Sequence, residues 1–100
     1  MIAISRLCYH IEGIVQGVGF RPFVYTLAKR FHLKGFVLNT AQGVLIDIEG
    51  PQEDLDAFEH ALYNELPPLA RMDICEKTKE PYVGYATFEI NHSIQSPTKS

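Results

Sequence analysis

The sequence predicts one α+β domain in which two helices cover one face of an antiparallel five-stranded sheet. Three observations lead to this prediction: stretches in which apolar and polar residues alternate, two stretches with apolar residues at helical spacing, and glycine or proline between them. The chain has 100 residues, of which 46% are hydrophobic and 21% charged, so it is long enough for one compact core. Disorder and a membrane span are both excluded, because the apolar content is high and no apolar run approaches about 20 residues.

The first strand and the first helix are predicted from the start of the chain. Apolar residues occupy every second position within residues 7–15, which is typical of a half-buried strand. Two glycines then interrupt the pattern, and Pro22 suits the first turn of a helix. Basic residues gather near the expected end of that helix, where they favour the negative end of its dipole. We expect Gly35 to be the residue just beyond this helix.

The remaining elements follow from the same rules. A glycine-containing stretch between two alternating stretches predicts a hairpin, and acidic residues after Gly50-Pro51 suit the positive end of a second helix. The order β-α-β-β-α-β-β is that of the ferredoxin-like, or split βαβ, fold. The expected elements are strands at 35–39 and 44–49, a helix over 51–66, and strands at 70–78 and 84–90, with residues 1–90 as the domain and 91–100 as a polar tail or linker to further domains.

Charge and cysteine content restrict the function. The net charge is −3, which argues against a nucleic-acid-binding surface, but residues 1–50 hold five basic and three acidic residues, so an anionic ligand is expected there. Cys8 and Cys75 are far apart and no secretory signal precedes them, which predicts reduced thiols and a cytoplasmic protein. With His10 they could bind zinc, but no CxxC or HxxxH spacing is present. We therefore expect neither a metal nor another cofactor in this domain.

The strongest candidate site is the loop between the first strand and the first helix. Backbone N–H groups of such a glycine-containing loop can point at one anion beside the positive helix end, and Arg21 adds donors suited to phosphate oxygens. In the alternative interpretation, the glycines only form a tight turn and Arg21 is solvated. A nucleotide is not expected, because no Gly-Lys-Ser/Thr is present and Pro22 stands where a dinucleotide motif has glycine. Asn39, at the end of the second strand, could orient a water and a ligand oxygen, or could simply be a turn residue.

Two motifs together resemble the paired signature of the acylphosphatases, over residues 6–90. They are Gly13-x-Val15-Gln16-Gly17-Val18-Gly19-Phe20-Arg21 and Gly35-Phe36-Val37-Leu38-Asn39-Thr40-x-x-Gly43. The resemblance implies the fold predicted above and metal-free hydrolysis of carboxyl-phosphate anhydrides. It also implies that Asn39 orients the attacking water and that the phosphoryl group is bound by Arg21 and the N–H groups of Gln16, Gly17, Val18, Gly19 and Phe20.

A narrower resemblance is carried by Arg21-Pro22-Phe23-Val24-Tyr25 and by Pro67-Pro68-Leu69-Ala70-Arg71-Met72-Asp73. These segments are similar to the N-terminal acylphosphatase-like domain of the carbamoyltransferases that mature [NiFe]-hydrogenases. The short spacing from Gly43 to Gly50, one residue less than is usual in small acylphosphatases, favours the same family. The resemblance implies carbamoyl phosphate as substrate, downstream domains in the same chain, and a maturation partner protein that receives the carbamoyl group from which the cyanide ligands are made.

Other functions remain open at this point. The chain could be a free-standing acylphosphatase, or a module that binds phosphate or carbamoyl phosphate without turnover. An RNA-binding domain of the same topology is a poorer interpretation, because the chain is acidic and lacks a basic, aromatic strand face.

Overall fold

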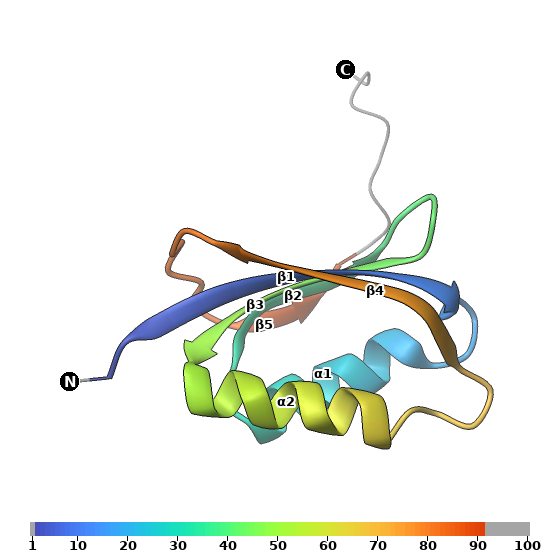
Figure 1. Ribbon diagram of the computed structural model, residues 1–100, viewed down its shortest axis with the longest axis horizontal. Coiled ribbons are helices and arrows are strands. Elements are labelled where there is room, and N and C mark those ends of the chain that lie inside the picture. Colours follow the sequence, from blue (N-terminus) through green and yellow to red (C-terminus); the bar gives the residue numbers. More distant parts are fainter. Residues whose placement is uncertain (1, 92–100) are drawn as a thin grey trace, which may run out of the picture.

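The computed structural model describes residues 2–91, and over this range the protein has two layers (Figure 1). One layer is a five-stranded sheet, and the other consists of helices α1 (Phe20–Arg30) and α2 (Gln52–Asn64). The predicted element order and the ferredoxin-like fold are confirmed. Of the predicted tail, 91–100, only Asn91 is described, and residues 92–100 lie outside the described residues. The strands are β1 (Ile4–Ile14), β2 (Lys34–Asn39), β3 (Val44–Pro51), β4 (Arg71–Glu80) and β5 (Phe88–Ile90).

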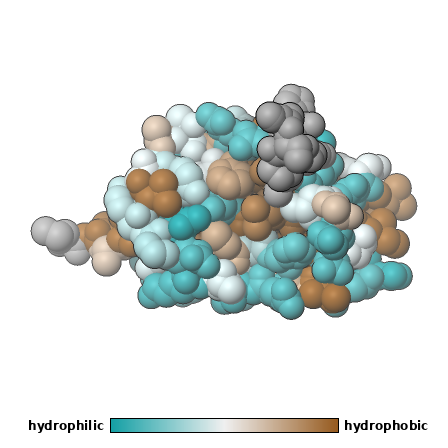
Figure 2. Space-filling model, turned by 90° about the horizontal axis from the view of Figure 1, so that it is seen from above, coloured by the Kyte–Doolittle hydropathy of each residue, from teal (hydrophilic) through white to brown (hydrophobic). Residues whose placement is uncertain are grey.

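The core lies between the sheet and the helices, and the alternation within the strands produces it. In β1, Leu7, Tyr9 and Ile11 are buried beneath the helices, while their neighbours point to the other face. Full burial of one such side chain stabilises the fold by about 1.5–3 kcal/mol. Figure 2 shows the face of the sheet that neither helix covers, where hydrophobic residues near the centre and at the edges lie among hydrophilic ones. Within residues 2–91, neither helix is long and apolar enough to cross a membrane.

The sheet is mixed rather than fully antiparallel, which corrects one detail of the prediction. The strand order is β4-β1-β3-β2-β5, and the pair formed by β2 and β5 is parallel. The reason is the direction of β4: it ends at the end of the sheet where β2 begins. The next strand must therefore run back in the direction of β2, and the segment 81–87 carries the chain across the sheet to reach it.

The end of α1 also differs from the prediction, because His32 and not Gly35 is the residue just beyond the helix. His32 adopts a left-handed backbone conformation with φ of 59°, and the N–H of Leu33 donates to the Ala28 carbonyl at 2.8 Å. This is the hydrogen bonding of a Schellman motif. Gly35 lies instead within β2, where a Cβ atom would come 1.8 Å from the Asp47 carbonyl oxygen. The glycine is needed for close strand packing and not for ending the helix.

The last strand is shorter than predicted, since β5 comprises only Phe88–Ile90. Residues 84–87 of the predicted strand belong to the segment that crosses the sheet. The backbone N–H groups of Val83, Gly84 and Tyr85 donate to the Glu49 carboxylate and are not available for strand pairing. A side chain 34 to 36 residues away therefore decides this boundary.

Candidate functional site

The candidate residues meet at one end of the sheet because three strands end there. Strands β1, β2 and β5 run in the same direction, since β1 and β2 are both antiparallel to β3 and β5 is parallel to β2. The loop 15–19 follows β1, Asn39 is the last residue of β2, and Asn91 follows β5. The second strand is not the neighbour of the first, because β3 lies between them. The loop and Asn39 must therefore be brought together across one intervening strand.

Two left-handed glycines shape the loop that precedes α1. The φ angles are 75° at Gly17 and 79° at Gly19, a region that residues with a Cβ rarely adopt. Gly19 is the N-cap of α1, no side chain caps this end, and the first turn contains no acidic residue. Within the described part of the chain, no protein acceptor receives a hydrogen bond from the N–H groups of residues 16–20. The positive end of α1 and these donors thus remain available to an anion.

The side chain of Gln16 joins this loop to the hairpin between β2 and β3. Its amide nitrogen donates to the carbonyl oxygens of Thr40 and Gly43, both at 2.8 Å. The hydroxyl of Thr40 in turn accepts a hydrogen bond from the Gly43 N–H at 3.0 Å. A Cβ on Gly43 would lie 2.0 Å from the Ile11 carbonyl oxygen, so only glycine allows the hairpin to approach β1 this closely. Gln16 is therefore the contact that bridges β3 and brings the loop to the end of β2.

Arg21 lies in the first turn of α1 and is half-buried. One terminal nitrogen of its guanidinium donates to the backbone carbonyl of Asn91 at 2.9 Å. Asn91 is itself attached to β2, since its N–H donates to the Val37 carbonyl at 2.8 Å. Arg21 is thus held beside the end of β2, and is not the freely solvated residue of the alternative interpretation.

Asn39 carries an unusual polar atom. Its Oδ1 is buried and has no hydrogen-bond partner; among the described residues the same is true only of His10 Nε2. Buried polar atoms are nearly always hydrogen-bonded, so a buried acceptor without a partner needs an explanation. A carbonyl oxygen in this state can accept a hydrogen bond from a water or ligand at the same end of the sheet. This observation favours the functional interpretation of Asn39 over the turn interpretation.

A shallow hollow of about 380 Å³ adjoins the loop on the side of the hairpin. It is lined by Gly13, Ile14, Val15, Gln16, Ala41, Gln42 and Gly43. Of the predicted phosphate-binding residues only Gln16 lines it, and Arg21 and Asn39 do not, so the hollow lies beside the two proposed catalytic residues and does not contain them.

The three candidate zinc ligands do not form a site. Cys8 and His10 lie on the open face of the sheet, whereas Cys75 pairs with Ile11, whose side chain points toward the helices. Within residues 2–91, no group of three His, Cys, Asp or Glu side chains is arranged to hold a metal ion. Both cysteines are free thiols. The pKa of Cys8 is raised to about 11, mainly by burial and also by the nearby carboxylate of Asp47.

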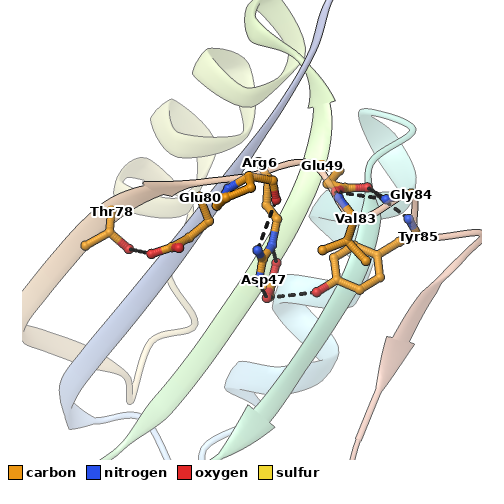
Figure 3. Close-up of polar contacts among 9 residues, drawn as sticks. Arg6, Asp47, Glu49, Thr78, Glu80, Val83, Gly84 and Tyr85 are labelled. Carbon is orange, nitrogen blue, oxygen red and sulfur yellow. Dashed lines mark hydrogen bonds and ion pairs between the residues drawn. The ribbon is translucent and has the colours of Figure 1, made fainter.

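Sequence analysis missed a polar cluster at the opposite end of the sheet (Figure 3). Arg6 donates two hydrogen bonds to the buried carboxylate of Asp47, at 2.9 and 2.7 Å, and the Tyr85 hydroxyl donates to it at 2.9 Å. Burial opposes ionisation of Asp47, but these donors outweigh it and hold its pKa below the ordinary value. Glu49 accepts the three N–H groups of residues 83–85. Asp47 and Glu49 occupy the polar positions of the alternation in β3, as solvent-exposed acids would, so the local sequence pattern gives no sign of this cluster.

Comparison with known proteins agrees with the predicted family. Residues 7–90 match the family model of the acylphosphatases. The acylphosphatase of Thermotoga maritima is 36% identical over 89 residues, which are 88% of this chain and 98% of that protein. The crystal structure of the Bacillus subtilis acylphosphatase has a TM-score of 0.79 and 33% identity, covering 89% of this chain and 99% of that one.

A second group of relatives is much longer. The carbamoyltransferase HypF of Rhizobium leguminosarum bv. viciae is 46% identical over 91 residues, which are 91% of this chain but 12% of that protein. A crystal structure of full-length HypF in a phosphate- and nucleotide-bound form has a TM-score of 0.90 and 35% identity, again over 93% of this chain and 12% of that one. The chain thus spans about one eighth of the length of these relatives. It belongs to the acylphosphatase family and is similar to the N-terminal domain of the HypF carbamoyltransferases.

Proposed function

We propose that this domain hydrolyses acyl phosphates at the end of the sheet where Arg21, Asn39 and the loop 15–19 lie. The observation that carries the proposal is the buried, unpartnered Oδ1 of Asn39, at the same end of the sheet as a loop whose N–H groups have no acceptor within residues 2–91. One feature offers an acceptor that could orient a water, and the other offers donors for an anion. Hydrolysis of a phosphoryl compound requires both.

In this proposal the phosphoryl group is bound by the guanidinium of Arg21 and by the backbone N–H groups of residues 16–20. Arginine donates two parallel hydrogen bonds to phosphate oxygens, and the helix N-terminus adds a partial positive charge. These groups also stabilise the charge that the phosphoryl oxygens carry in the transition state. Binding therefore needs no metal, and a chelator should leave both phosphate affinity and rate unchanged.

Asn39 would act on the attacking water. Its Oδ1 accepts a hydrogen bond from the water and directs the oxygen lone pair toward phosphorus. The bond from the water oxygen to phosphorus forms, the bond from phosphorus to the acyl oxygen breaks, and the carboxylate or carbamate leaves with the electron pair. The proton of the water passes to a phosphoryl oxygen of the substrate. Because the leaving group is already a weak base, no pair of carboxylates is needed for acid catalysis.

The test compares two variants with the wild-type chain. Arg21→Ala should lose inorganic phosphate binding and lower kcat/KM for acetyl phosphate by at least about a hundredfold, the usual effect of removing one such donor. Asn39→Ala should keep phosphate binding but lower kcat by about a hundredfold. Arg21→Lys should also fail, because a single ammonium group cannot reproduce the paired hydrogen bonds. Calorimetric titration with phosphate and release of phosphate from acetyl phosphate measure the two properties separately.

The same experiment separates hydrolysis from binding alone. Unchanged phosphate affinity in Arg21→Ala would overturn the assignment of the site. If the wild-type chain binds phosphate but releases none from acetyl or carbamoyl phosphate, the domain is a binding module and not a hydrolase.

The similarity to HypF supports a more specific proposal. We infer that the substrate is carbamoyl phosphate and that this domain belongs to a longer carbamoyltransferase that makes the cyanide ligands of [NiFe]-hydrogenase with a maturation partner protein. The length of the relatives supports further domains in the same chain. A higher kcat/KM for carbamoyl phosphate than for acetyl phosphate is the expected result, and the reverse preference would contradict it.

A further inference from the structure

The backbone carbonyl of Asn91 is the one protein acceptor of the Arg21 guanidinium among the described residues. The bond runs from a terminal guanidinium nitrogen to the carbonyl oxygen at 2.9 Å and connects residues 70 positions apart. The contact is partly buried, so water competes with it less than at an open surface. The sequence motif that contains Arg21 says nothing about this partner.

Asn91 cannot move freely, because β2 holds its backbone. The N–H of Asn91 donates to the Val37 carbonyl at 2.8 Å, one residue beyond the last parallel pair of β2 and β5, Val37 with Ile90. Asn91 thus extends the pairing of β5 by one hydrogen bond. Its carbonyl is fixed relative to β2, the same strand that ends at Asn39 two residues after Val37.

We propose that Asn91 is a positioning residue, whose backbone carbonyl keeps the Arg21 guanidinium in its phosphate-binding orientation. The inference rests on the proposed function of Arg21. An arginine side chain that is already immobilised loses less conformational freedom when the ligand binds, so the ligand binds more tightly. Only one N–H of the guanidinium is used, so the remaining donors stay available for phosphate oxygens.

The side chain of Asn91 has no part in this proposal, which allows a matched pair of variants. Asn91→Pro removes the N–H that bonds to Val37, and so releases the carbonyl from β2. Asn91→Ala keeps both backbone groups and removes only the side chain. We expect Asn91→Pro to raise the Kd for inorganic phosphate and the KM for acetyl phosphate about three- to tenfold, with a much smaller change in kcat. Asn91→Ala should match the wild-type chain in all three.

Several results would test the positioning role of Asn91. A phosphate Kd for Asn91→Pro equal to that of the wild-type chain would overturn the proposal, as would an equal rise in Asn91→Ala, which would assign the effect to the side chain. A fall in kcat with unchanged KM would also contradict it. If Asn91→Pro does not fold, Asn91→Gly, which keeps the N–H but loosens the backbone, must still raise the phosphate Kd.

Arg21→Ala serves as the reference in the same titration. If it binds phosphate as tightly as the wild-type chain, the proposed function itself fails. If it loses binding while Asn91→Pro is unaffected, only the positioning role fails.

Discussion

Two groups of backbone N–H donors lie at opposite ends of the sheet, and among the described residues only one of them has an acceptor in the protein. At one end, the N–H groups of Val83, Gly84 and Tyr85 donate to the carboxylate of Glu49. At the other end, the N–H groups of residues 16–20 have no acceptor within residues 2–91. Both segments contain glycine with positive φ, and both can bind a negatively charged oxygen. They differ in whether the chain supplies that oxygen.

Burial explains why the two ends differ. Glu49 is only 3% exposed, so its buried carboxylate needs the three donors, and leaving one of these hydrogen bonds unmade would cost about 1–3 kcal/mol, although Val83 and Gly84 are themselves exposed. Gln16, Gly17 and Gly19 are exposed, so their donors can bind water and exchange it for a ligand. The N–H donors of residues 83–85, which bind the protein's own Glu49 carboxylate, therefore stabilise the fold. A similar cluster left open to solvent is a candidate binding site.

Removing the carboxylate of Glu49 should lower the stability of the fold more than any other change at these two ends of the sheet. Glu49→Ala removes the acceptor of three N–H groups and should lower the free energy of unfolding by about 3–5 kcal/mol. Glu49→Gln keeps one carbonyl acceptor and should lose less. Urea unfolding measures both, and phosphate titration at low temperature should show that affinity stays within about twofold of wild type. A large loss of phosphate affinity in folded Glu49→Gln would show that the two ends are not independent.

The second prediction concerns the pH dependence of stability and rests on Asp47, the other buried acid of the polar cluster that contains Glu49. Its folded pKa is lowered, so its contribution to stability is present above the unfolded value of about 4 and is lost as the pH falls through the folded pKa. Asp47→Asn should lower the free energy of unfolding at pH 7 by about 2 kcal/mol and flatten its decline below about pH 4.

A matched control is the solvent-exposed pair of Arg30 and Glu65, which joins the two helices at 3.0 Å. Glu65→Gln should change stability at pH 7 very little, because exposed ion pairs are screened by solvent. Urea unfolding at pH 7 and pH 3.5 compares the variants. If Asp47→Asn kept the full acid sensitivity of the wild-type chain, the assignment to Asp47 would be wrong.

One glycine in each group of N–H donors, Gly19 and Gly84, allows a direct test of the difference between the two ends, although the expected effects on stability are small. Gly19 and Gly84 have φ of 79° and 91°, and an added Cβ would make no close contact at either. Gly19→Ala and Gly84→Ala should therefore each cost about 1 kcal/mol of backbone strain. Only Gly19→Ala should also weaken phosphate binding. Equal weakening in both variants would remove the functional distinction between the two ends.

Much of the fold could be predicted because its signals are local. Alternation in residues 7–15 and helical spacing after Pro22 depend on residues a few positions apart, and both elements were confirmed. The family was also predictable, because two short motifs with fixed spacing carry it. The beginning of β5 was wrong because a distant residue decides it: Glu49 takes the N–H groups of the predicted strand. The end of α1 was wrong for a local reason, because His32 adopts the left-handed conformation that was expected of Gly35.

The candidate site divides in the same way. The residue types needed for phosphate chemistry, Arg21, Asn39 and the loop glycines, can be read from the chain because each stands in a motif next to a predicted strand or helix. The contacts that hold these residues in place cannot be read from the chain. The hydrogen bond from Arg21 to Asn91 spans 70 residues, and those from Gln16 to the hairpin span 24 and 27. Local pattern specifies which elements form and which groups they carry. The order of strands in the sheet, fixed by packing of the whole core, specifies which of those groups meet.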